Sequence, residues 1–192
     1  MAWSMKPIAV LLPWRRKPPH ADELYGAIVA RARLPVFYQG FGVPDTLEGR
    51  FVVLSLHLFA VLHRLKDGDA SASSMAQDLA DHFTADMETV LRELGVGDLA
   101  IPKKVRALAA SGAALLQNYE EALGEGEDAL ATSIAYALPL DEAPAKLASA
   151  RLTAYLMRVI RHLDAQPVAD LCAGRLTVAE PCAEQALRDE RT

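Results

Sequence analysis

Three ionisable side chains recur at intervals of seven residues in the middle of a long apolar stretch, at Arg50, His57 and Arg64. Because seven residues make about two turns of helix, this spacing places all three on one side of a helix, along the flank of its apolar stripe. Asp86 interrupts the apolar stripe of the next predicted helix, where an unpaired carboxylate is costly to bury. We therefore expect Asp86 to form an ion pair with Arg50 or His57 between the two helices.

This predicted cluster has two interpretations. It is either a structural ion pair or a polar pocket around Arg50, His57 and Asp86, as in a small helical enzyme or a haem-handling protein. The sequence contains no nucleophile elbow, Walker-type phosphate loop, GxGxxG turn or HExxH motif. His57 and His63 are six residues apart, so they lie on different sides of a helix and are poorly placed to share a metal ion. The structural interpretation is favoured, and we expect no catalysis, no metal and no cofactor.

The stretch GFGVPDTLEGRF, residues 40–51, combines turn residues with the start of the long apolar helix. Asp45 followed by Glu48 three residues later resembles a capping box with aspartate as the cap. Gly49 does not fit this pattern, because a glycine early in a helix costs up to about 1 kcal/mol relative to alanine. We infer that another backbone passes close to Gly49. A related stretch, LGVGDLAIPKK, follows at residues 94–104.

Helical periodicity dominates the rest of the chain. Of the 192 residues, 52% are hydrophobic and 23% charged, and alanine and leucine exceed the β-branched types. Apolar residues at spacings of three and four predict helices at 22–33, 46–65, 75–94, 102–123, 128–138 and 143–164. Ser74 and Asp128 are candidate caps for two of these helices. The predicted fold is an all-α single domain of about six helices at residues 21–166, after a proline-rich segment (1–20) and before a C-terminal tail (167–192).

Charge is distributed unevenly along the chain. Residues 1–20 carry four basic side chains and no acidic one, so a net charge of −5 divides into +4 for this segment and −9 for the remainder. The segment also holds both tryptophans and an apolar run, PIAVLLPW, which at eight residues is too short for a membrane span of about 20. Arg151, Arg158 and Arg161 give the helix at 143–164 a basic face. Both features are typical of proteins that bind a membrane surface or a partner protein.

Several segments, taken together, are similar to one known family. They are LYGAIVARARLPVFYQGFGVPDTLEGRFVVLSLHLFAVLHRL, DMETVLRELGVGDLAIPKKVRALA and YEEAL, all within residues 24–123. This part of the chain resembles the ubiquinol-cytochrome c chaperones, which are assembly factors for the cytochrome bc1 complex. The resemblance implies a non-enzymatic helical chaperone that binds newly made cytochrome b as its client. It also implies a cytoplasmic protein, peripheral on the inner membrane, with a small second assembly factor as a further partner and no nucleic acid.

The resemblance also supplies candidate site residues. Those matched to the family and expected to bind a partner are Tyr38, Asp45, Arg50, His57, Arg92, Asp98, Lys103 and Lys104. The ion pair expected from the helix pattern, between Asp86 and Arg50, involves two further matched positions. One departure is Glu88, where we expect aspartate in this family, and it keeps the negative charge.

Overall fold

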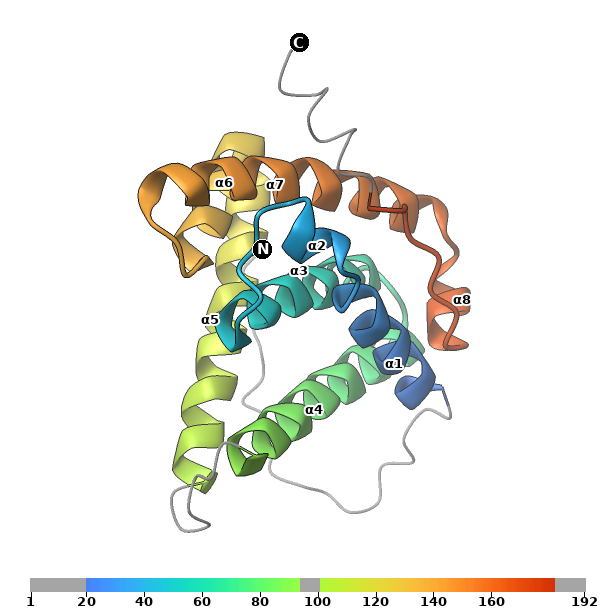
Figure 1. Ribbon diagram of the computed structural model, residues 1–192. Coiled ribbons are helices and arrows are strands. Elements are labelled where there is room, and N and C mark those ends of the chain that lie inside the picture. Colours follow the sequence, from blue (N-terminus) through green and yellow to red (C-terminus); the bar gives the residue numbers. More distant parts are fainter. Residues whose placement is uncertain (1–19, 94–100, 182–192) are drawn as a thin grey trace.

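The computed structural model describes residues 20–93 and 101–181, and over these residues it is helical without a strand (Figure 1). The helices are α1 (Ala21–Ala32), α2 (Val36–Gln39), α3 (Leu47–Leu65), α4 (Ala70–Glu93), α5 (Ile101–Glu125), α6 (Glu127–Ala137), α7 (Glu142–Ala165) and α8 (Val168–Cys172). The predicted all-α single domain is confirmed. Each of the six predicted helices is present, and the two short helices α2 and α8 are additional.

Helix α3 lies at the centre of the domain, with α1, α4, α5 and α7 around it (Figure 1). Buried side chains lie on opposite sides of it: Leu58 is fully buried on one side, and Leu56 and Phe59 are 3% and 2% exposed on the other. A helix that is apolar nearly all round must be covered on all sides, as its sequence predicts. The neighbouring helices therefore pack against α3 along most of its length, and its first two turns are the part that stays partly open.

One predicted helix start and two predicted caps are wrong. Helix α4 begins at Ala70 rather than at residue 75, because the Asp69 carboxylate accepts hydrogen bonds from two first-turn backbone N–H groups, at 2.9 and 3.1 Å. This cap replaces the predicted one at Ser74. Helix α6 follows Gly126, whose φ of 125° ends the preceding turn, and no side chain caps it. Asp128 is therefore not a cap, since it already lies within the helix.

The chain beyond residue 166 is more ordered than predicted. Residues 168–181 form α8 and a segment that packs on the core, where Leu171 is fully buried and Val178 is 8% exposed. The Gln166 side-chain amide forms two hydrogen bonds with this segment. It donates to the backbone carbonyl of residue 175 and accepts from the backbone N–H of residue 177. The predicted boundary at residue 166 is therefore wrong, and the folded part reaches at least residue 181.

Candidate partner-binding groove

An open groove with a volume of about 1020 Å³ lies between α1, α3, α4, α5 and α6. Its walls are largely apolar, and the apolar contributors include Val29, Phe51, Leu54, Met87, Val90 and Leu115. Among the described residues, the large hydrophobic side chains that are exposed are Leu47, Tyr136 and Leu147, and the first two line this groove. Tyr136 is 94% exposed and Leu47 is 47% exposed. A contiguous apolar surface of this kind typically marks a site for a partner or ligand.

The floor of the groove depends on a close approach between α4 and α5. A Cβ atom at Gly112 would lie 2.9 Å from an edge carbon of the Phe83 ring, so glycine is needed at this point of α5. The Phe83 ring in turn packs against Phe51 of α3, with ring centroids 5.7 Å apart. Gly112 thus allows a close approach between α4 and α5, and the Phe51–Phe83 contact joins α3 to them next to the groove.

The first turn of α3 lines the groove with Leu47, Glu48 and Arg50, and this helix is capped by Thr46 rather than by Asp45. The Thr46 backbone is extended, and its hydroxyl accepts a hydrogen bond from the backbone N–H of Gly49 at 3.2 Å. The predicted cap at Asp45 is wrong because Asp45 lies one residue too far from the helix. The close backbone predicted near Gly49 is confirmed, since a Cβ atom there would lie 2.1 Å from the carbonyl oxygen of Pro44.

Replacing the capping residue should have a measurable cost. We expect Thr46→Ala to lower the free energy of unfolding by about 1 kcal/mol, because the first turn of α3 loses an acceptor for one of its free N–H groups. Asp45→Ala should cost less, because Asp45 caps nothing and its ion pair is exposed. Urea titration of both variants tests this order, and a larger loss for Asp45→Ala would contradict the assignment of the cap.

The predicted ion pair between Arg50 and Asp86 is wrong, although both side chains line the groove. The Arg50 Nε donates to Asp45 Oδ1 at 2.6 Å, and this hydrogen bond lowers the pKa of the Asp45 carboxyl. The Arg50 guanidinium also lies 5.6 Å from the centroid of the Tyr38 ring. The Asp86 carboxylate instead accepts a hydrogen bond from the Tyr25 hydroxyl at 2.9 Å. Each charged group thus has a partner nearer than the one predicted.

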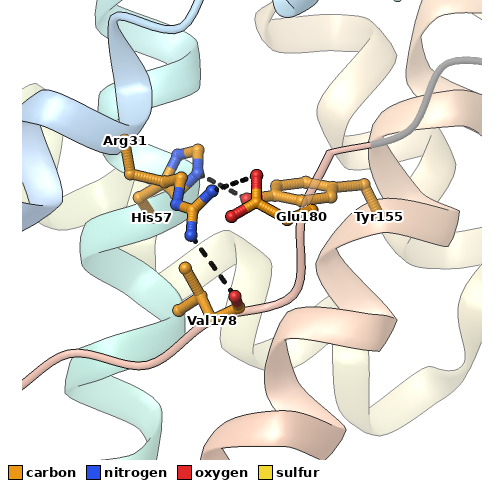
Figure 2. A network of polar contacts seen from close by, with 5 residues as sticks. All are labelled: Arg31, His57, Tyr155, Val178 and Glu180. Carbon is orange, nitrogen blue, oxygen red and sulfur yellow. Dashed lines mark hydrogen bonds and ion pairs between the residues drawn. The ribbon is translucent and has the colours of Figure 1, made fainter.

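His57 is buried between α3 and α7 and does not belong to the groove. Its side chain bonds the backbone carbonyl of Val53 through Nδ1 at 2.8 Å and the Tyr155 hydroxyl through Nε2 at 2.9 Å. Burial lowers the pKa of His57 to about 4. Figure 2 shows this pair beside Arg31 and the C-terminal segment that carries Glu180. His57 is therefore not available for direct contact with a partner, and it does not form a polar pocket with Arg50 and Asp86.

The other predicted site residues are distributed more widely. Tyr38 lines the groove, and its hydroxyl donates to the backbone carbonyl of Ala32 at 2.8 Å. Arg92 is half-exposed near the end of α4 and pairs with Glu88 at 2.8 Å. Lys103 and Lys104 belong to the first turn of α5, but their side chains lie outside the description, as does the whole of Asp98. The structure therefore brings Tyr38 and Arg50 together at the groove and separates Arg92 and His57 from it.

Of the two basic surfaces predicted from the sequence, the one on α7 lies within the described residues and the one at the N-terminus lies outside them. On α7, Arg151 reaches across to the loop before α3 and donates to the backbone carbonyl of Gly40 at 3.2 Å. This side chain therefore holds the loop that leads into α3, in addition to contributing charge. The basic N-terminal segment lies outside the described residues, apart from residue 20.

The described part of the chain lacks two further kinds of site. Within residues 20–93 and 101–181, no three histidine, cysteine, aspartate or glutamate side chains converge in a way that could hold a metal ion. In the same ranges, none of the helices combines the length and the apolar character needed to cross a bilayer.

Comparison with known proteins finds similar sequences and a similar structure. The family model described as ubiquinol-cytochrome C chaperone matches residues 39–179. Ubiquinol-cytochrome-c reductase complex assembly factor 1 of Xenopus laevis is 22% identical over 165 residues, which cover 86% of this chain and 82% of that protein. The crystal structure of the Cbp3 homolog from Brucella abortus has a TM-score of 0.77 and 33% sequence identity, and the match covers 88% of this chain and 92% of that one.

Proposed function

The chain belongs to the ubiquinol-cytochrome c chaperone family, as its sequence motifs predict, and we propose that it binds newly made cytochrome b in the groove between α1, α3, α4, α5 and α6. The observation that carries this proposal is the groove itself, with the exposed Leu47 and Tyr136 at its edge. Cytochrome b is a membrane protein, and before assembly its apolar helices need cover from water. An apolar groove is suited to such a helix, in the manner of other helix-in-groove complexes.

The polar side chains around the groove would orient the client. Arg50, held by Asp45 and stacked near Tyr38, presents its guanidinium at the rim, where it can bond helix-end carbonyls or acidic side chains of the client. Asp86 lies on the opposite wall with Tyr25 as its partner. These groups leave the apolar floor free for the client and need no catalytic chemistry, so we propose that the protein acts as a chaperone and not as an enzyme.

The remaining candidates would serve other contacts. We propose that Arg92, Asp98, Lys103 and Lys104, around the α4–α5 connection, contribute to binding a small second assembly factor. We also propose that the protein works at the cytoplasmic face of the inner membrane as a peripheral protein, where the basic N-terminal segment could contact anionic lipid.

A charge placed in the groove should weaken client binding without unfolding the protein. Ala114 is an exposed residue of α5 that lines the groove, and Ala110 is exposed one turn earlier and does not line it. We expect Ala114→Glu to weaken binding of cytochrome b about tenfold or more, because the carboxylate loses its hydration when an apolar helix covers it. Ala110→Glu is the matched control and should bind normally.

The readout is complementation of a strain that lacks the gene. The deletion should lower b-type haem absorbance and bc1 activity while other respiratory enzymes stay intact. Wild-type protein and Ala110→Glu should restore both, and Ala114→Glu should not. Normal bc1 levels in the deletion strain would count against the function, whereas full rescue by Ala114→Glu would count against the groove.

A further inference from the structure

The described chain begins at one end of α1, and the other end of this helix lines the groove. Helix α1 starts at Ala21, directly after His20, and its far end supplies Val29 and Ala32 to the groove wall. The nineteen residues before His20 lie outside the description. They include the apolar run PIAVLLPW at residues 7–14, followed by the basic residues Arg15, Arg16 and Lys17.

The distances allow the apolar run to reach the groove. At a rise of about 1.5 Å per residue, Ala21 and Val29 are about 12 Å apart along α1. Residues 15–20 can extend by about 3.3 Å each, or roughly 20 Å in total. A chain that leaves His20 and doubles back along α1 can therefore deliver residues 7–14 to the groove with length to spare.

The charges along this path are complementary. The seam between α1 and α4 carries Asp22 in the first turn of α1, with its Oδ1 2.9 Å from His82 Nε2, and the His82 ring stacks on Tyr25 with centroids 5.4 Å apart. The Tyr25 hydroxyl then bonds Asp86, which lines the groove. The Asp22 side chain is 80% exposed. Two carboxylates, Asp22 and Asp86, thus lie along the route and would attract the three consecutive basic residues, whereas Arg33 and Arg50 line the groove itself, where the uncharged run 7–14 would lie.

We propose that residues 7–14 of this same chain occupy the groove when no client is present, with Arg15, Arg16 and Lys17 along the α1–α4 seam. Such a placeholder would cover the apolar surface around Leu47 and Tyr136, which otherwise favours non-specific association. The client would then bind by displacing it. The displacement step rests on the proposed function, whereas the docking of the segment does not.

The protein contains its own probe for this docking, because its two tryptophans, Trp3 and Trp14, both lie in the segment. In full-length protein carrying Trp3→Phe, the emission comes from Trp14 alone. We expect it at a shorter wavelength than that of a peptide of residues 1–19 with the same substitution, and protected from acrylamide quenching. Adding Ala114→Glu should shift the emission to longer wavelength and restore quenching, and adding Ala110→Glu should do neither.

A second set of variants tests the charged route. Replacing Arg15, Arg16 and Lys17 with glutamate should release Trp14 in the same way, whereas Arg15→Lys with Arg16→Lys should leave it docked. Emission equal to that of the free peptide would overturn the proposal. So would emission that is insensitive to Ala114→Glu, that depends on protein concentration, or that shifts to shorter wavelength only when anionic vesicles are added. No client is present in this assay, so its failure leaves the complementation result unaffected.

Discussion

Gly49→Ala is expected to lower the free energy of unfolding by about 1–3 kcal/mol, although alanine is the better helix former. The added Cβ atom would lie 2.1 Å from the Pro44 carbonyl oxygen and 3.2 Å from a Val43 methyl group. The first of these contacts is with backbone, which cannot rotate away as a side chain can. The loop before α3 must therefore move, or the first turn of the helix must unwind.

The surrounding contacts make either movement costly. Val43 is 2% exposed, and its backbone N–H donates to the carbonyl of Phe37 at 3.2 Å. Phe41, in the same loop, is fully buried. Arg151 of α7 holds the loop from the other side through the Gly40 carbonyl. Because this loop supports Arg50 and Leu47 at the groove, we expect Gly49→Ala to weaken client binding as well.

Gly26→Ala is the matched control. Gly26 is an exposed residue within α1, and a Cβ atom there would have nothing within 4 Å. We expect this substitution to raise the free energy of unfolding by up to about 1 kcal/mol, because alanine loses less backbone entropy in a helix. Urea titration of the two variants should give opposite signs. A stabilising Gly49→Ala would show that the loop yields easily, and would contradict the close contact.

Most of the fold follows from local patterns in the sequence. The six long helices have enough turns for a 3.6-residue period to show, and the apolar stripes predict their buried faces. Helices α2 and α8 have only four and five residues, so they contain too few periodic positions to be recognised. The early start of α4 is hidden by the turn-like composition of its first residues, and only the Asp69 cap reveals it.

The groove is harder to predict because it is a property of several helices together. Periodicity tells which side of a helix a residue lies on, but it does not tell which neighbour that side meets. Arg50 and Asp86 do line the same groove, yet Arg50 bonds the local Asp45, and Asp86 bonds Tyr25 of α1. The sequence does not single out Tyr136, because a tyrosine in a short helix has no local signal that separates an exposed aromatic from a buried one.

His57, one of the positions matched to the family, has a role in the core of the protein and not at its surface. The Val53 carbonyl can only accept a hydrogen bond, so His57 Nδ1 carries the proton and Nε2 accepts from the Tyr155 hydroxyl. Phe37 lies edge-on to the imidazole, with ring centroids 5.3 Å apart, and thereby connects α2 to the pair. The neutral imidazole therefore joins three helices in the core, and a charged imidazole would lose the bond from Tyr155.

This geometry predicts that acid destabilises the protein through His57. Burial holds the pKa of His57 at about 4 in the folded protein, and the nearby Arg31 lowers it further, while the bond to Val53 opposes the shift. In the unfolded chain the pKa is about 6.5, so between these values the unfolded state binds more protons. The stability contributed by neutral His57 is present in full above pH 6.5 and is lost as the pH falls toward 4. The total is about 3 kcal/mol, of which about 2 kcal/mol is lost between pH 7 and pH 5.

The test compares wild type with His57→Gln, which cannot titrate in this range but keeps an amide oxygen that can accept from Tyr155. We expect His57→Gln to be less stable at pH 7 and to lose about 2 kcal/mol less than wild type between pH 7 and pH 5. Carboxylates such as Glu120, whose pKa is lowered by Lys66 and His63, contribute equally to both proteins and cancel in the difference. Tyr155→Phe separates the hydroxyl from burial: it removes a hydrogen bond that only the neutral imidazole can accept but leaves His57 buried, so its loss between pH 7 and pH 5 should fall between those of wild type and His57→Gln. If His57→Gln lost as much stability on acidification as wild type, the imidazole would already be accessible to protons, and the pair could not be a closed part of the core.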